Sequence, residues 1–166
     1  GEREYLPGKE MKLENHGVLI MEGIHALNPE LLRGIPEEAI YRVYVSALSP
    51  LSIDDHNWIS TSDNRLIRRM VRDMKFRGTS AEETILRWQE VRRGEEQWIF
   101  PYQENADVMF NSGFLYEMPA LKEQAVSALR QVCEKSPAYP TASRLLTFLD
   151  LFESLPMEST PRNSLL

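Results

Sequence analysis

DNRLIRRMVRDMKFRGTS, residues 63–80, contains five arginines and one lysine in a chain whose formal net charge is −6. On a helix, residues spaced i, i+3, i+4 and i+7 share one face. Four arginines have this spacing: Arg65, Arg68, Arg69 and Arg72. The opposite face is apolar and holds Leu66, Ile67, Met70, Val71 and Met74. The stretch therefore predicts an amphipathic helix that is capped by Asp63 and ends at Gly78.

The cationic face of this helix has two interpretations. Like charges three and four residues apart cost a few tenths of a kcal/mol per pair, so negative charge is expected close by. Acidic side chains elsewhere in this acidic chain could neutralise the arginines, or the arginines could bind an anionic ligand such as phosphate. Spacing alone favours neither interpretation.

The composition indicates one globular domain. With 166 residues, of which 42% are hydrophobic and 27% charged, the chain can bury one sizeable core. No apolar run reaches the roughly 18 to 20 residues of a membrane span, and the first residues lack the apolar core of a secretory signal. Cys133 is the single cysteine and the three histidines are scattered, so no disulfide or metal-ligand cluster is expected. We therefore expect a cytoplasmic protein.

Positive charge is concentrated in one part of the chain. Nine of the nineteen basic residues lie between positions 65 and 93. A protein that binds duplex nucleic acid is usually basic overall, whereas this chain is acidic outside that stretch. The distribution favours a compact anion as the ligand.

Three runs of apolar residues predict strands. Residues 18–21, VLIM, form a continuous apolar run that is typical of a strand buried on both faces. Residues 39–47 and 106–110 are rich in β-formers, and residues 116–119 are expected to form a short extended edge. Together these runs predict an α/β layer.

Further helices are predicted on both sides of these strands. A short helical turn is expected at residues 30–33, and Ser80 with Glu83 fits a capping box that opens a long helix. This helix and the arginine helix would form a basic hairpin around FRGTS. Apolar spacing predicts two more helices at residues 120–133 and 141–152, followed by a tail.

Glu22 is the acidic residue most suggestive of chemistry. It follows the predicted strand at residues 18–21, and open α/β sheets bind ligands at the carboxyl ends of their strands. There it could hold Mg²⁺, or it could cap a helix or pair with an arginine. His25 lies close by and could contact a substrate or be a structural histidine. Mg²⁺ with several arginines would suit phosphoryl transfer, yet these residues contain no G-x-x-x-x-G-K-[ST] phosphate loop.

Three motifs in this order resemble one family. They are VLIMEGIHALNP at residues 18–29, RLIRRMVRDMKFRG at residues 65–78 and PYQENADV at residues 101–108. As a set they are similar to the carboxyl-terminal half of the uridine kinase and phosphoribulokinase group of P-loop kinases. YEMPALKEQA and SRLLTFLDLF, further on, resemble the longer bacterial uridine kinase-like proteins that often carry a TGS domain. By this resemblance we expect the sequence to be truncated at both ends.

The resemblance implies an enzyme that transfers a phosphoryl group from ATP or GTP, with Mg²⁺, to the 5′-hydroxyl of a pyrimidine ribonucleoside, uridine or cytidine. Glu22 would match the family's acidic residue at the metal site. Arg65 would match the arginine on the nucleoside side, with Arg77 and His25 also assigned to substrate binding. The catalytic arginines of the family's lid would match Arg68, Arg69 and Arg72.

The expected fold class is α/β: a partial P-loop kinase fold, with a parallel sheet flanked by helices and a basic helical lid hairpin. Residues 1–118 would be the carboxyl-terminal half of a nucleoside kinase domain, residues 119–153 a helical extension and residues 154–166 a tail. The family's phosphate loop and the aspartate that accepts the hydroxyl proton are not among these residues. We therefore expect this chain alone to be inactive, and to self-associate because a sheet edge is uncovered.

Two other functions fit the same residues. The basic hairpin could belong to a noncatalytic regulatory module that binds a nucleotide or RNA. The arginines could also serve only to hold the domain against other parts of the same protein. Sequence pattern does not separate these alternatives from the kinase.

Overall fold

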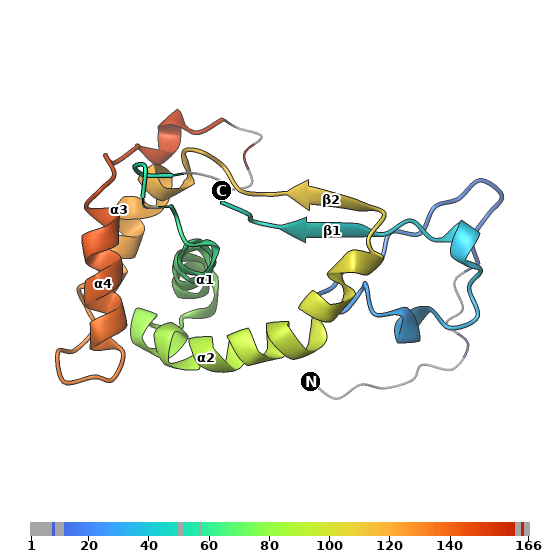
Figure 1. Cartoon of the computed structure of the whole chain (residues 1–166), viewed down its shortest axis with the longest axis horizontal. Helices are drawn as coiled ribbons and strands as arrows, with labels where there is room; N and C mark the ends of the chain where they lie inside the picture. Colours follow the sequence, from blue (N-terminus) through green and yellow to red (C-terminus); the bar gives the residue numbers. More distant parts are fainter. Residues whose placement is uncertain (1–7, 9–11, 50–51, 57, 162–163, 165–166) are drawn as a thin grey trace.

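The structure is a computed structural model that describes residues 8, 12–49, 52–56, 58–161 and 164. Figure 1 shows four helices gathered at one end, a short two-stranded sheet beside them, and an irregular amino-terminal segment at the other end. Within that segment, two short 3-10 helices cover Pro29–Leu32 and Glu37–Ala39. The first confirms the helical turn predicted at residues 30–33.

The sheet consists of two parallel strands, β1 (Val43–Ser46) and β2 (Val108–Asn111). Val43 pairs with Val108, and the register continues to Ser46 opposite Asn111. Parallel strands need a long crossover, and here the chain passes through two helices between them (Figure 1). The strands predicted at residues 39–47 and 106–110 are therefore confirmed, as is the α/β class with a parallel sheet and helices.

The strand predicted at residues 18–21 is wrong. These residues form no ladder in the described part of the chain, and Ile20 is 87% exposed. A buried strand needs a neighbour for its N–H and C=O groups and cover on both faces. Among the described residues, β1 and β2 pair only with each other. A continuous apolar run therefore identifies a segment that is able to form a strand. It does not show whether a neighbouring strand is present to pair with that segment.

Helix α1 (Thr61–Arg77) is the arginine helix, and its apolar face is buried as predicted. Ser60 caps its start by accepting a hydrogen bond from the backbone N–H of Asp63. The predicted cap, Asp63, lies instead within the first turn. The helix ends at Gly78, which has the left-handed conformation with φ 63° that favours glycine.

Helix α2 (Ala81–Trp98) begins with the predicted capping box. The Ser80 hydroxyl accepts from the Glu83 N–H, and the Glu83 carboxylate accepts from the Ser80 N–H at 2.9 Å. The hydrogen bonds that the Glu83 carboxylate accepts from the Ser80 N–H and from the Ser80 hydroxyl lower the pKa of Glu83. A 3-10 helix, Phe100–Asn105, then leads into β2.

Helices α3 (Glu117–Leu129) and α4 (Tyr139–Leu149) follow β2, and a short 3-10 helix covers Met157–Ser159. The extended edge predicted at residues 116–119 is wrong, because α3 has already begun there. Pro119 is tolerated in the first turn of α3, where a backbone N–H would have no helical partner.

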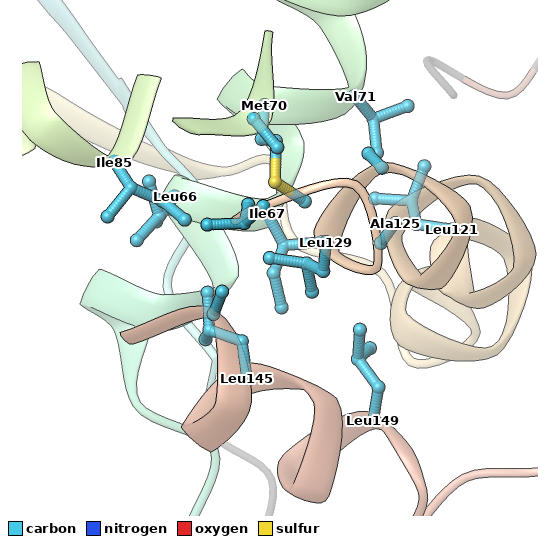
Figure 2. Close-up of a cluster of buried hydrophobic side chains, with 14 of the residues drawn as sticks. Leu66, Ile67, Met70, Val71, Ile85, Leu121, Ala125, Leu129, Leu145 and Leu149 are labelled. Atoms are coloured by element: carbon cyan, nitrogen blue, oxygen red, sulfur yellow. The ribbon is translucent and has the colours of Figure 1, made fainter. Parts of the chain in front are cut away.

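The hydrophobic core lies among the four helices and not on the sheet. Figure 2 shows Leu66, Ile67 and Met70 of α1 gathered with Leu129 of α3 and with two leucines of α4. The two leucines, Leu145 and Leu149, are fully buried. None of the described helices has the length and apolar character that crossing a membrane requires.

Candidate functional site

The arginine face of α1 carries the candidate site, and its members contact different partners. Arg65 forms a two-pronged ion pair with Glu95 of α2, in which Nη1 donates to Oε2 at 2.9 Å. The same guanidinium lies 6.0 Å from the centre of the Phe100 ring, and Arg92 lies over that ring at 5.9 Å. Arg65 thus holds α1 against the carboxyl end of α2.

Arg68 points toward α3. Its Nε lies 2.8 Å from Oε1 of Glu117, and its Nη1 donates to the backbone oxygen of Ser112 at 3.4 Å. Asn64, one turn earlier on α1, donates from Nδ2 to the other carboxylate oxygen of Glu117 at 3.2 Å. Burial raises the pKa of Glu117, against the opposing effects of the Arg68 charge and the Asn64 hydrogen bond.

Two arginines of this face, together with Arg77 at the end of α1, share a single acid. Arg69, Arg72 and Arg77 approach the carboxylate of Asp73 at 3.3, 3.1 and 3.1 Å. The Asp73 side chain is only 6% exposed, whereas those of Arg72 and Arg77 are 50% and 56% exposed. We call these four residues the Asp73 cluster. One negative charge faces three positive charges there, and the described residues supply no second acid in an ion pair with these arginines.

Acidic neighbours therefore account for only part of the arginine face. Arg65 and Arg68 are each matched by one buried carboxylate, as the first interpretation of the sequence required. The Asp73 cluster keeps surplus positive charge at an accessible surface, which the second interpretation required. A guanidinium presents several N–H donors in a plane that suits phosphate oxygens. The cluster is thus the part of the face suited to a phosphate group.

Glu22 and His25 are both exposed, and the structure does not bring them to the arginines. Figure 1 places the segment that contains them at the opposite end of the molecule from α1. No group of three or more His, Cys, Asp or Glu side chains in the described part of the chain could hold a metal ion. The assignment of Mg²⁺ to Glu22 therefore rests on the family resemblance alone.

Sequence reasoning missed all three acids that contact the arginine face. Asp73 could have been found, because it lies four residues after Arg69 and four before Arg77, and such pairs meet on a helix. Glu95 and Glu117 lie 30 and 49 positions from their partners, and no spacing rule connects them.

Comparisons with known proteins match these residues to one family. The model of the "Phosphoribulokinase / Uridine kinase family" matches residues 2–117. A uridine kinase of Anoxybacillus flavithermus is 32% identical over 104 residues, which are 62% of this chain and 42% of that protein. A uridine kinase of Staphylococcus epidermidis is 33% identical over 97 residues, 58% of this chain and 39% of that protein.

The match to relatives of this kind is partial. The uridine kinase of Bacillus pumilus is 32% identical over 102 residues, covering 61% of this chain and 41% of that protein. The chain thus spans about two fifths of the length of these curated relatives. No solved structure matches it significantly. Since the family model covers well over half of the chain, the chain belongs to the phosphoribulokinase and uridine kinase family.

Proposed function

We propose that the whole protein is a nucleoside kinase and that this chain supplies the arginines that neutralise the phosphates. The reaction moves a phosphoryl group from ATP or GTP to the 5′-hydroxyl of uridine or cytidine. The observation that carries the proposal is the Asp73 cluster, where three arginines face one buried carboxylate. The curated relatives named uridine kinase support the substrate class.

The Asp73 cluster has the chemistry that phosphoryl transfer asks of a protein. In that reaction negative charge is spread over the transferring phosphoryl oxygens, and positioned cations stabilise it. Arg69 and Arg72 are held beside each other by Asp73 before any ligand binds. Their repulsion is therefore already offset in the free protein, and a bound phosphate takes up the charge that Asp73 leaves unmatched.

The other residues that the sequence assigned to the site have different roles in this proposal. Arg65 and Arg68 are engaged by Glu95 and Glu117, so they act through the position they give α1. Arg77 joins the phosphate contacts from the end of the helix. Glu22 and His25 remain candidates on the family resemblance alone, and no step of the proposal uses them or a metal ion.

Binding of inorganic tripolyphosphate to this chain tests the site. Calorimetric titration should show binding that Arg72→Ala weakens roughly ten- to a hundredfold, because a hydrogen bond between charged groups contributes roughly 1.5–3 kcal/mol. Arg130→Ala is the matched control, since it removes the same charge from an exposed position at the end of α3. Equal affinities in the two variants would overturn the phosphate site.

Turnover by the whole protein tests the reaction. A coupled ADP-release assay with uridine or cytidine should show activity, and Arg72→Ala should lower kcat by on the order of 10²-fold with a smaller change in nucleoside KM. This chain alone should show none, because its residues include no phosphate loop. Tripolyphosphate binding without turnover by the whole protein would instead favour the noncatalytic regulatory module.

A further inference from the structure

We propose that Glu117 is a positioning residue: it fixes the rotation of α1 about its own axis and so aims the Asp73 cluster at its ligand. This inference rests on the proposed function, because it concerns the same phosphate site. Glu117 touches neither Arg69, Arg72 nor Arg77 in any ion pair of the described residues. Its effect on them must pass through the helix.

Glu117 receives two side chains from successive turns of α1. Asn64 donates to one carboxylate oxygen at 3.2 Å, and Arg68 Nε lies 2.8 Å from the other. These two contacts lie one turn apart on α1 and meet a single carboxylate. Together they fix the rotation of α1 about its axis, and so the side of the helix that faces α3. The carboxylate itself cannot move freely, because Glu117 is the first residue of α3 and is 1% exposed.

The apolar core cannot fix that rotation with the same precision. Hydrophobic contacts are non-directional, so a small turn or slide of α1 can exchange one apolar neighbour for another. Hydrogen bonds and ion pairs in a buried network depend on direction, and a small displacement loses them. Arg69 follows Arg68 directly and Arg72 lies one turn on. Whatever fixes Arg68 therefore also fixes where these two project.

Two buried atoms of the network have no hydrogen-bond partner among the described residues: Oδ1 of Asn64, and Oε1 of Glu117, which Arg68 contacts only as an ion pair. Leaving an acceptor such as Oδ1 of Asn64 unpaired costs stability, and an apolar residue at position 64 would avoid that cost. Asn64 instead keeps its Nδ2 contact with Glu117. A network with this defect suits orientation of α1 better than it suits stability.

Glu117 also stands at a boundary in the chain. The family match ends at this residue, and α3 continues beyond it into residues that pack against α1 and α4. Glu117 therefore connects the family portion to the helices that follow it. The orientation of the arginines thus depends on α3 being in place.

The positioning role and simple electrostatics predict opposite results for Glu117→Gln. Removing a negative charge near a cationic site should strengthen anion binding if charge alone matters. If Glu117 positions α1, the same variant should weaken tripolyphosphate binding, about tenfold. Asp63→Asn is the matched control, because it also removes one negative charge. Asp63 pairs with Arg144 and has no contact in the Glu117 network of the described residues. The affinity of this variant should be unchanged or higher.

Variants of Arg68 complete the test. Arg68→Lys keeps the charge but loses the Nε–H, and should weaken tripolyphosphate binding as much as Glu117→Gln does, with no further loss in the double variant. If Arg68 were itself a phosphate ligand, Glu117→Gln would release it and strengthen binding, and this result would overturn the proposal. Circular dichroism checks that each variant is folded. If Glu117→Gln is not, Asn64→Ala takes its place, because that variant removes the other side-chain contact with Glu117 and keeps Arg68.

A measurement without ligand separates this inference from the proposed function. The methyl signals of Ile67 and Met70 in carbon-edited NMR spectra should move in Glu117→Gln, because a rotation of α1 changes the neighbours of these side chains in the core. If the wild-type chain binds no tripolyphosphate but these signals move, the phosphate site fails and the positioning role stands. If they stay in place and affinity does not fall, Glu117 has no positioning role.

Discussion

Asp73 shows how one carboxylate can gather several cations on a helix. Arg69 and Arg77 lie one turn before and one turn after it, and Arg72 is its direct neighbour. The carboxylate is nearly buried, so its charge is poorly screened by water and attracts the arginines strongly. The three guanidinium groups stay together in spite of their mutual repulsion. The cluster therefore keeps its surplus positive charge in one place in the free protein.

Glu117 should make the protein less stable as the pH rises. Burial raises its pKa above the ordinary value of 4.5. A carboxyl whose pKa is raised in the folded state keeps its proton there while the unfolded chain has lost it. The free energy of unfolding therefore falls as the pH rises from 4.5 through the folded-state pKa.

Glu117→Gln should remove this dependence. Chemical denaturation of both proteins across that range should show that raising the pH changes their stability difference in favour of the glutamine variant. Equal slopes of stability against pH in both proteins would contradict the assignment of the shift to this residue.

At this scale the sequence predicted which residues are cationic and which face they share, but not what each contacts. Arg65 and Arg68 have the same helical spacing as Arg69 and Arg72. Only tertiary packing directs the first pair toward Glu95 and Glu117. Spacing along a helix describes neighbours on that helix alone. The fold was therefore needed to separate the arginines that pair with other helices from those that share Asp73.

Two glycines, one at the end of α1 and one within α2, should respond to alanine in opposite ways. Gly78 has φ 63°, where a side chain is strained, whereas Gly94 lies inside a regular helix. A Cβ atom at either position would meet nothing within 4 Å, so steric contact does not complicate the comparison. Gly78→Ala should destabilise the protein by about 1 kcal/mol. Gly94→Ala should stabilise it by roughly 0.8–1 kcal/mol through helix propensity.

Thermal unfolding of the two glycine variants beside the wild type checks the signs. A shift of both melting temperatures in the same direction would show that something other than backbone conformation governs one of these positions. The pair also tests whether the arginine helix ends where its sequence indicates.

Elements with local signals were predictable and elements without them were not. The ends of α1 and the capping box of α2 depend on residues within one turn, so the sequence specifies them directly. Residues 18–21 carried an equally clear apolar signal, yet a strand is completed only by a neighbour. The start of α3 has no side-chain cap, and Pro119 is compatible with a first helical turn as well as with an extended segment.

At the scale of the whole molecule, the helices are covered and the sheet is not. The core joins all four helices. Two of them, α3 and α4, lie almost entirely after the residues that the family model matches. The sheet consists of two strands in the described residues, so each strand has one edge without a partner. A parallel sheet is normally buried on both faces, which makes this arrangement unusual. The exposed strands are therefore a part of the surface prone to association.

We expect copies of this chain to associate through that sheet. Val45 and Phe110 are paired across the two strands and are 59% and 54% exposed, and Val43 and Val108 are exposed beside them. Apolar residues on an open sheet with unpaired edges favour contact with a second copy. Light scattering should therefore show a mass that rises with concentration.

Val45→Lys with Phe110→Lys should reduce this association, because desolvating charged side chains in the contact opposes it. Leu86→Lys with Leu151→Lys is the control, since both leucines are exposed and lie outside the sheet. If the control abolishes association and the sheet variant does not, the contact lies elsewhere. A stable monomer at high concentration in the wild type would mean that the open sheet face is tolerated in water, and that its exposed apolar side chains do not drive assembly.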